Sequence, residues 1–452
     1  MLGVALLAVA GVAYVLGYRG GSSPPTETTP TQTVAKPPPP ESVTASPYTA
    51  TVTWTTAEAS TAELRWGPAG SEPVLWDSVE TPASRHVVKL VGLASSTAYR
   101  LSLVSTSAGQ TEQKELSFTT APAPTQVQGT IENGVLLVNG EPFFPLLTWQ
   151  QCPVQWNESL VAGINLFAVG SPCSTPASTA SDLAGRALVV AADGSSGPLG
   201  SFYPDEADAR GLTGASLPAL PAGLRFLTIT AHFASMAAPL PAGRGMYPAL
   251  VAAADVVGFD FYPLQELCRR DLLAADFDAQ RELEALAPGK PTFQWIESRG
   301  MRCGTSPDVA ISAATIRTES WLALAAGAHG LGFFPPDWDS GAVSAIGGIS
   351  ARIRQLEPAL LQPVQPVSVS GAPDVRASAR TYNGAVYVIV VNAGTTASTP
   401  RLTVPGLGDR MLHLLGKPTL LPAKGDVFTD TLGPLRTRIY VAAPQTGDAQ
   451  SP

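Results

Sequence analysis

The sequence predicts a multidomain protein: a β-sandwich, then a (β/α)8 TIM-type barrel, then a small C-terminal β-sandwich. Three observations lead to this fold class. The 452 residues exceed one ordinary domain. Residues 44–122 and 366–443 contain short runs in which apolar and polar side chains alternate, as in half-buried strands. Residues 127–365 instead alternate apolar, β-rich runs with Ala/Leu-rich stretches, which is typical of a parallel sheet with crossover helices.

The composition argues against nucleic-acid binding and against a metal site. Hydrophobic residues make up 45% and charged residues 14%, and the net charge is −8. Without a basic patch to neutralise phosphates, a nucleic-acid partner is not expected. The four histidines are far apart and form no HExxH motif, and the cysteines form no Cys-x-x-Cys pair. We therefore expect no metal site and no cofactor, and we expect a monomer.

The amino terminus predicts export. Residues 1–20 are apolar up to Leu16, followed by Arg19, without a preceding basic segment. This stretch fits a signal anchor or a signal peptide, and the sequence does not decide whether it is cleaved. Residues 21–43 are rich in Pro and Thr and predict an extended linker. Residues 444–452 are expected to be a disordered tail.

The first module, residues 44–122, contains five short strand-like runs. They are Ala50–Trp54, Ala62–Trp66, His86–Leu90, Tyr99–Leu103 and Glu115–Phe118. Leu93, Thr97 and Tyr99, followed by a turn at Gly109, resemble the closing strands of a fibronectin type III domain. That resemblance implies a spacer or binding module.

The barrel segment contains eight strand-like runs, the number that a (β/α)8 barrel requires. They are Phe143–Thr148, Ile164–Val169, Ala187–Ala192, Leu199–Tyr203, Phe226–Thr230, Val256–Phe261, Thr292–Ile296 and Gly330–Phe334. The clearest helices are Asp271–Leu286, Pro307–Ala326 and Ala342–Leu361. Only residues 193–198 separate the third and fourth runs, although a parallel crossover normally needs a dozen residues. Either the third helix is missing and the barrel is irregular, or one of these two strands is wrong.

Acidic side chains follow two of these strands, where barrel enzymes place their active sites. Asp205 and Glu206 come after the fourth run, and Glu297 comes after the seventh, 91 residues later. Two such carboxyl groups suit glycoside hydrolysis, which needs a proton donor and a nucleophile or base. Asp193 and Asp260 also end strands.

The order of motifs in this segment resembles the retaining glycoside hydrolases of clan A. The motifs are Val138–Pro145, Gly163–Asn165, Asp255–Pro263 and Gly327–Phe334 followed by Trp338. The resemblance implies Glu206 as general acid/base and Glu297 as nucleophile.

The same resemblance suggests substrate-binding side chains. Tyr262 would hydrogen-bond the nucleophile, while Trp338 and Trp149 would stack on sugar faces. Members of this clan commonly have Asn where this chain has Asp205, and an ionised Asp can only accept a hydrogen bond. His232, after the fifth strand, could line a subsite or serve a structural role.

The four cysteines predict two disulfides. Cys152 and Cys173 follow strands one and two, and Cys268 and Cys303 follow strands six and seven. Of the three possible connectivities, only Cys152–Cys173 with Cys268–Cys303 joins neighbouring loops.

These observations predict an exported glycoside hydrolase that is tethered to a membrane or secreted and cleaves a surface or extracellular polysaccharide. Two alternatives remain open. A decayed barrel could bind carbohydrate without turnover, as the missing third helix and Asp205 would allow. A metallophosphatase would need His and Asp metal ligands that the chain lacks.

Overall fold

The computed structural model describes residues 41–124, 126–170 and 172–445. Residues 1–20, nearly all of the predicted linker 21–43 and nearly all of the tail 444–452 lie outside this part, so the predictions for them stay untested. In the part that the structure describes, no helix is long and apolar enough to span a membrane.

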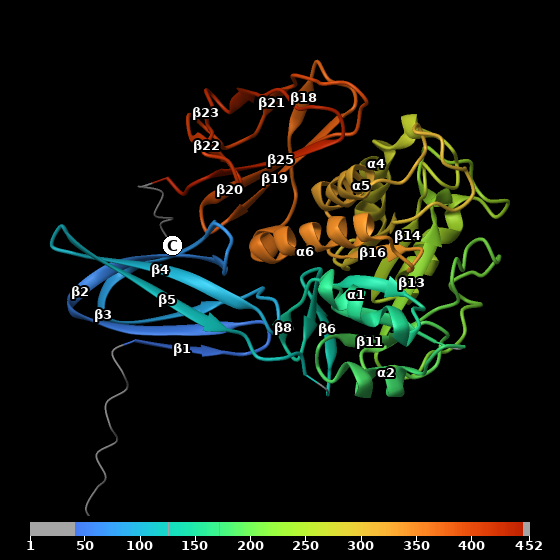
Figure 1. Cartoon of the computed structure of the whole chain (residues 1–452), viewed down its shortest axis with the longest axis horizontal. Coiled ribbons are helices and arrows are strands. Elements are labelled where there is room, and N and C mark those ends of the chain that lie inside the picture. The colour runs from blue at the N-terminus through green and yellow to red at the C-terminus, as the bar shows by residue number, and fades with distance from the viewer. Residues whose placement is uncertain (1–40, 125, 171, 446–452) are drawn as a thin grey trace, which may run out of the picture. The chain divides into compact units, whose positions relative to one another are not determined.

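The centre of the chain is a closed barrel of eight parallel strands, as predicted (Figure 1). Each strand pairs with the next one in sequence, and the eighth pairs with the first. The strands are β9 (Leu146–Trp149), β10 (Leu166–Val169), β11 (Leu188–Ala191), β12 (Gly200–Phe202), β13 (Leu224–Thr230), β14 (Val256–Asp260), β15 (Thr292–Glu297) and β16 (Leu331–Phe334). All eight overlap the runs that the sequence predicted.

The short interval between β11 and β12 contains no helix. The two strands pair in parallel at a single position, Ala191 with Ser201. Hydrogen bonds within the β11–β12 connection hold it close to the start of β12. The Ser201 hydroxyl donates to the backbone carbonyl of Ser195, and the Ser195 hydroxyl donates to Asp193 at 2.6 Å. Both predicted strands are therefore present, and the crossover helix is missing.

Among the described residues, six α-helices accompany the barrel. They are α1 (Trp156–Val161), α2 (Pro176–Leu183), α3 (Tyr247–Ala253), α4 (Ala275–Leu286), α5 (Ala313–Ala326) and α6 (Ser340–Leu360). The prediction for α5 began too early, because Ser312 is its N-cap and accepts a hydrogen bond from the amide of Thr315. Helix α6 is capped in the same way by Asp339, which accepts from the amide of Ala342.

Aromatic rings fill the barrel interior, and two glycines make room for them. Phe293 and Trp295 pack edge to face, with ring centroids 5.6 Å apart. A Cβ atom at Gly258 would lie 2.2 Å from the Phe293 ring, and one at Gly332 would lie 2.1 Å from Trp295. Any larger residue at either glycine would therefore displace a buried ring.

A small three-stranded sheet precedes the barrel. It consists of β6 (Gly129–Glu132), β7 (Val135–Val138) and β8 (Glu141–Pro142). Leu136 and Val138 belong to the same apolar cluster as Leu188 and Leu224 of the barrel. Since Leu224 begins β13, this sheet covers the N-terminal end of the barrel, opposite the end that carries the acidic side chains.

The N-terminal module is an antiparallel sheet of five strands. They are β1 (Glu41–Ala45), β2 (Ala50–Pro68), β3 (Leu75–Leu90), β4 (Ala98–Ser107) and β5 (Gln110–Thr119). Two runs expected as separate strands lie in the single long strand β2, and β1 begins inside the segment assigned to the linker. The fibronectin type III resemblance stays a prediction.

The C-terminal module is the predicted β-sandwich, made of two antiparallel sheets. Its six-stranded sheet holds β17 (Gln365–Pro366), β19 (Val375–Tyr382), β20 (Ala385–Asn392), β22 (Met411–Leu414), β23 (Leu420–Pro422) and β25 (Arg436–Ala442). The other sheet holds β18 (Ser368–Ser370), β21 (Arg401–Thr403) and β24 (Val427–Thr429).

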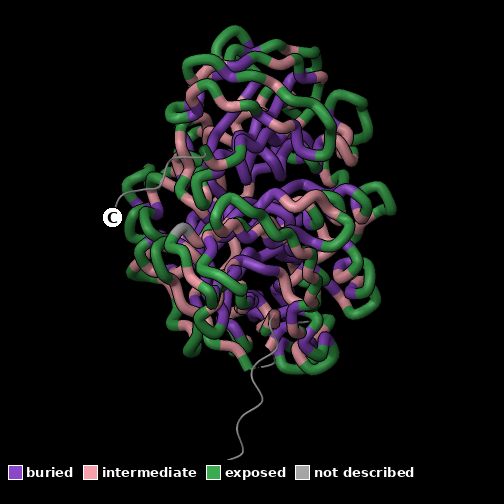
Figure 2. Tube along the Cα trace, turned by 90° about the vertical axis from the view of Figure 1, so that its left-hand side faces the viewer, coloured by how far each residue is buried: buried purple, intermediate pink, exposed green. Residues whose placement is uncertain are grey.

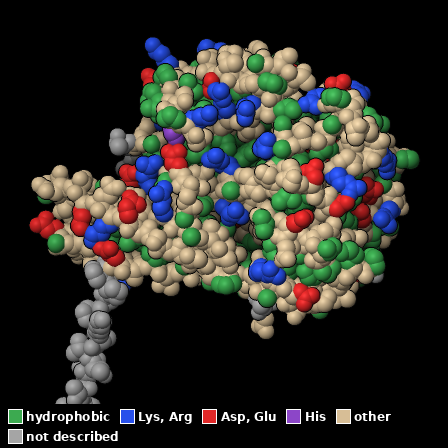
Figure 3. Space-filling view, viewed as in Figure 1, with side chains coloured by type: hydrophobic (Ala, Val, Ile, Leu, Met, Phe, Trp, Pro, Cys, Tyr) green, Lys and Arg blue, Asp and Glu red, His purple; other side chains and the backbone are tan. Residues whose placement is uncertain are grey.

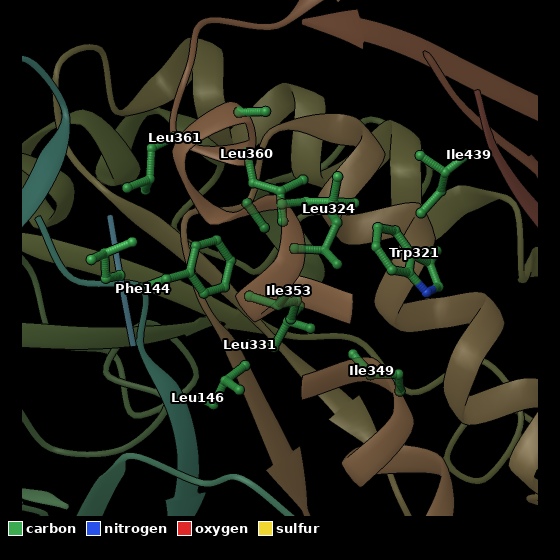
Figure 4. Packing of buried hydrophobic residues seen from close by; sticks show 14 of the residues in the cluster. Phe144, Leu146, Trp321, Leu324, Leu331, Ile349, Ile353, Leu360, Leu361 and Ile439 are labelled. Carbon is green, nitrogen blue, oxygen red and sulfur yellow. The ribbon is translucent and has the colours of Figure 1, made fainter. Parts of the chain in front are cut away.

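Ile439 of β25 joins an apolar cluster with Trp321 of α5 and Ile353 of α6 (Figure 4). Buried residues run through the sheets, while exposed residues concentrate in the connecting loops (Figure 2).

Candidate active site

A cavity of about 530 Å³ opens at the C-terminal ends of β9, β11 and β12. Trp149 and Gln150 border it after β9, Asp193 after β11, and Asp205 after β12, with Arg210 beside it. Parallel barrels place their catalytic groups at this end. The missing helix between β11 and β12 leaves only a short loop on this side.

The turn after β12 carries Asp205 and Glu206, both half-buried. Glu206 has a φ of +48°, a conformation that costs a non-glycine residue free energy and often marks a functional position. Asp208 fixes the turn, because its carboxylate accepts hydrogen bonds from the Thr230 amide at 3.0 Å and from the Tyr247 hydroxyl at 2.9 Å. The turn is thereby tied to the end of β13 and to α3.

Asp260 ends β14, and its carboxyl group interacts electrostatically with those of Asp205 and Glu206. Burial, and next the charge of Asp205, raise the pKa of Asp260 well above its usual range, with a smaller contribution from Glu206. Tyr262 donates a hydrogen bond to Asp260 Oδ1 at 2.9 Å. The predicted partner of Tyr262 was the nucleophile Glu297, whereas the hydrogen bond observed goes to Asp260.

The carboxyl groups after β12 also have raised pKa values. Burial raises the pKa of Asp205, and the positive charge of Arg210 opposes this rise. Burial also raises the pKa of Glu206, followed by the charges of Asp205 and Glu266. A raised pKa of this kind favours the protonated form of a carboxyl group, which is the form that a proton donor needs.

Glu297 lies at the end of β15 but does not face the cavity. Its side chain is 0% exposed. Its two carboxylate oxygens accept hydrogen bonds from the backbone amides of Leu264 and Gln265, both at 2.8 Å. No contact between Glu206 and Glu297 is present in the described structure, so the predicted catalytic pair stays a prediction.

The other predicted binding residues occupy different surroundings. Trp149 borders the cavity and packs edge to face against Phe202 and Trp295. The Trp338 indole N–H donates to the Ser298 hydroxyl at 3.1 Å. The Trp338 ring packs against the apolar cluster around α5 and α6. His232 contacts the carbonyl of Ala238 through Nδ1 at 2.6 Å. Of these three, only Trp149 lines the cavity.

The predicted disulfides are confirmed. Cys152 pairs with Cys173, with Cα atoms 5.1 Å apart, and Cys268 pairs with Cys303 at 5.4 Å. The second bridge joins the loop after β14 to the loop after β15. Both bridges are compatible with an exported protein.

Sequence reasoning underrated Asp260 and missed Gln265. Asp260 was expected only as a possible ligand contact at a strand end, although the Asp-Phe-Tyr sequence at the end of a buried strand could have drawn more attention to it. Gln265 is 1% exposed and bonds several backbone groups of the next loop, which no local sequence pattern indicates.

The described residues contain no group of His, Cys, Asp or Glu side chains arranged to hold a metal ion. On the face shown in Figure 3, basic and acidic side chains are interspersed rather than gathered into one basic patch.

No family model and no curated protein matches the chain. Solved structures with similar folds are glycoside hydrolases. An endoxylanase of family GH30 from Clostridium papyrosolvens is 9% identical over 70% of this chain and 99% of that chain, with a TM-score of 0.41. An α-amylase from Geobacillus thermoleovorans is 9% identical over 67% and 98%, also at 0.41. A β-glucuronidase from Ruminococcus gnavus is 8% identical over 69% and 67%, at 0.37. At these values the likeness does not establish a shared family or activity.

Proposed function

We propose that this protein is an exported glycoside hydrolase that cleaves a surface or extracellular polysaccharide at the C-terminal end of its barrel. The observation that carries the proposal is a cavity bordered by Asp205 and Trp149, together with the charge interaction between Asp205 and the buried Asp260 at the end of β14. An aromatic ring offers a flat face for an apolar sugar surface. The two disulfides support export.

The reacting pair in this proposal is Asp205 and Asp260. Glycoside hydrolysis needs one protonated and one ionised carboxyl group. Asp260 suits the proton donor, because burial and the neighbouring Asp205 raise its pKa well above the usual range. Asp205 suits the ionised partner, because it borders the cavity and Arg210 opposes the rise of its pKa. Such a division between like-charged neighbours is a common arrangement in acid catalysis.

Two predicted assignments compete with this pair. Glu206 lies next to Asp205 in the same turn, and its pKa is also raised, so it is the alternative proton donor. Glu297 is the alternative nucleophile, although it is fully buried and both its oxygens accept hydrogen bonds from the amides of Leu264 and Gln265.

The test is a set of single replacements assayed on one active substrate, found by screening aryl glycosides and soluble polysaccharides for release of reducing sugar. Asp205→Asn and Asp260→Asn should each lower kcat by about 100-fold or more. Glu206→Gln should have a smaller effect, and Asp182→Asn on α2 serves as a surface control. Full activity in Asp205→Asn would refute the assignment.

A non-catalytic carbohydrate-binding protein is the second candidate, favoured by the irregular β11–β12 connection. It predicts retention on a polysaccharide affinity gel without any turnover. Trp149→Ala should then abolish retention, whereas Asp205→Asn should leave retention unchanged.

A further inference from the structure

The buried carboxylate of Glu297 holds the backbone of the loop after β14. Its two oxygens accept from the consecutive amides of Leu264 and Gln265, at 2.8 Å each. Two successive backbone N–H groups directed at one anion form a concave anion site. Both oxygens are thus engaged with the protein, and Glu297 is 0% exposed, so its carboxylate is closed to substrate in this structure.

A second buried acid, Glu319, accepts a hydrogen bond from the backbone of Glu297. Glu319 of α5 is 1% exposed, and its Oε2 accepts a hydrogen bond from the Glu297 amide at 3.3 Å. Burial, and next the charge of Glu297, raise the pKa of Glu319 well above its usual range. Burial also raises the pKa of Glu297, to about 7, and the hydrogen bonds from the Leu264 and Gln265 amides oppose this rise. Of the two acids, Glu319 therefore holds its proton more strongly, and the two amide donors favour the ionised form of Glu297.

The loop that Glu297 holds carries part of the candidate active site. Leu264 follows Tyr262 by two residues, and the Tyr262 hydroxyl donates to Asp260. Tyr262 is itself buried and stacks on Phe334, the last residue of β16, with ring centroids 5.9 Å apart. Fixing the backbone at Leu264 therefore restricts where the Tyr262 hydroxyl meets Asp260.

Gln265, whose amide binds Glu297, also contacts the loop after β15 through its side chain. The Gln265 side chain donates to the carbonyls of Gly304 and Val309, at 3.2 and 2.7 Å, and it accepts from the Met301 amide at 2.8 Å. The Cys268–Cys303 bridge joins the two loops a second time. Glu297 thus lies at the base of two loops that are linked to each other.

We propose that Glu297 is a positioning residue: by binding the amides of Leu264 and Gln265 it orients the Asp260–Tyr262 pair and the β15–α5 loop, and it forms no bond to substrate. The consequence for catalysis rests on the function proposed above. The consequence for the loops is independent of that function. The effect on catalysis and the effect on the loops can therefore be measured in separate experiments.

The loop consequence is tested by hydrogen exchange of the purified protein. The amides of Leu264 and Gln265 should exchange slowly in the wild type, and at least one of them about tenfold or more faster in Glu297→Gln, because the Gln side chain offers one acceptor oxygen in place of two. Glu282→Gln is the matched control, since Glu282 also accepts from a loop amide, that of Ser235, at 2.8 Å. Unchanged exchange in Glu297→Gln overturns the proposal. If that variant does not fold, fast exchange at both amides in the wild type overturns it equally.

The catalytic consequence is tested by chemical rescue with azide once a substrate is known. Azide can replace a missing carboxylate nucleophile and form a glycosyl azide. We expect Glu297→Ala to lose part of its kcat and to gain nothing from azide, with Asp205→Ala as the variant that azide rescues. Rescue of Glu297→Ala with a glycosyl azide product would overturn the proposal. If no substrate is cleaved at all, the proposed function fails, while the exchange experiment still decides the role in the loops.

Discussion

Replacing Glu357 by Gln should make the stability of the protein less sensitive to alkaline pH. Glu357 lies in α6, is 4% exposed, and accepts a hydrogen bond from the Phe144 amide at 3.1 Å. Burial raises its pKa to about 8, and the Phe144 amide and the charge of Arg354 oppose this rise. The folded protein therefore keeps a proton on Glu357 that the unfolded chain releases.

The size of the effect follows from the two pKa values. In the unfolded chain the carboxyl loses its proton near 4.5, whereas in the folded protein it does so near 8. The contribution of the buried acid to stability is complete below the lower value and is lost as the pH rises through the higher one. The difference corresponds to an upper limit of about 4–5 kcal/mol in the free energy of unfolding. Gln has no proton to lose, so the variant should not show this decline.

The assay is thermal unfolding of both proteins at about pH 5 and about pH 8. The wild type should lose more of its melting temperature over this interval than Glu357→Gln does. Glu158→Gln, on the exposed surface of α1, is the matched control and should follow the wild type. Equal declines in the wild type and Glu357→Gln would refute the reasoning.

Three further results are expected. Trp149→Ala should raise KM about fivefold or more, because it removes a stacking face, while Trp149→Phe should raise it less; equal KM values would exclude Trp149 from the substrate site. Replacing the Cys268–Cys303 pair by serines should destabilise the fold by about 3–4 kcal/mol, as expected for a loop of this length, and an unchanged melting temperature would contradict this. Asp208→Ala should cost about 2–4 kcal/mol in denaturant unfolding, because the Thr230 amide and the Tyr247 hydroxyl lose their acceptor.

The barrel could be predicted because its strands are short, fully buried runs that leave a clear pattern in the sequence. The interval between β11 and β12 violates the usual crossover length, yet Leu188–Ala191 and Gly200–Phe202 are both strands. Sequence patterns alone could not settle this, because pairing at Ala191–Ser201 depends on the closure of the whole barrel. In the N-terminal module, the two predicted strands lie in the single strand β2, whose pairing with β3 shifts register between Thr55 and Ala62, where the sequence predicted a break.

The geometry of the candidate site follows less directly from the sequence than the fold does. Position after a strand directed attention to Asp205, which borders the cavity, and to Glu206, and the disulfides followed from loop adjacency. The direction of a side chain at a strand end is not encoded in local sequence. Glu297 occupies the predicted position, yet its carboxylate binds two backbone amides contributed by the preceding loop. Only the three-dimensional fold shows which of these acids can reach a cavity.

The most direct test of the central claim is to identify the carboxylate that a mechanism-based 2-deoxy-2-fluoro glycoside labels in the wild-type protein. Peptide mapping by mass spectrometry locates the adduct without any mutation. The account predicts a label on Asp205, in the turn after β12 beside the cavity. A label on Glu297 would contradict it.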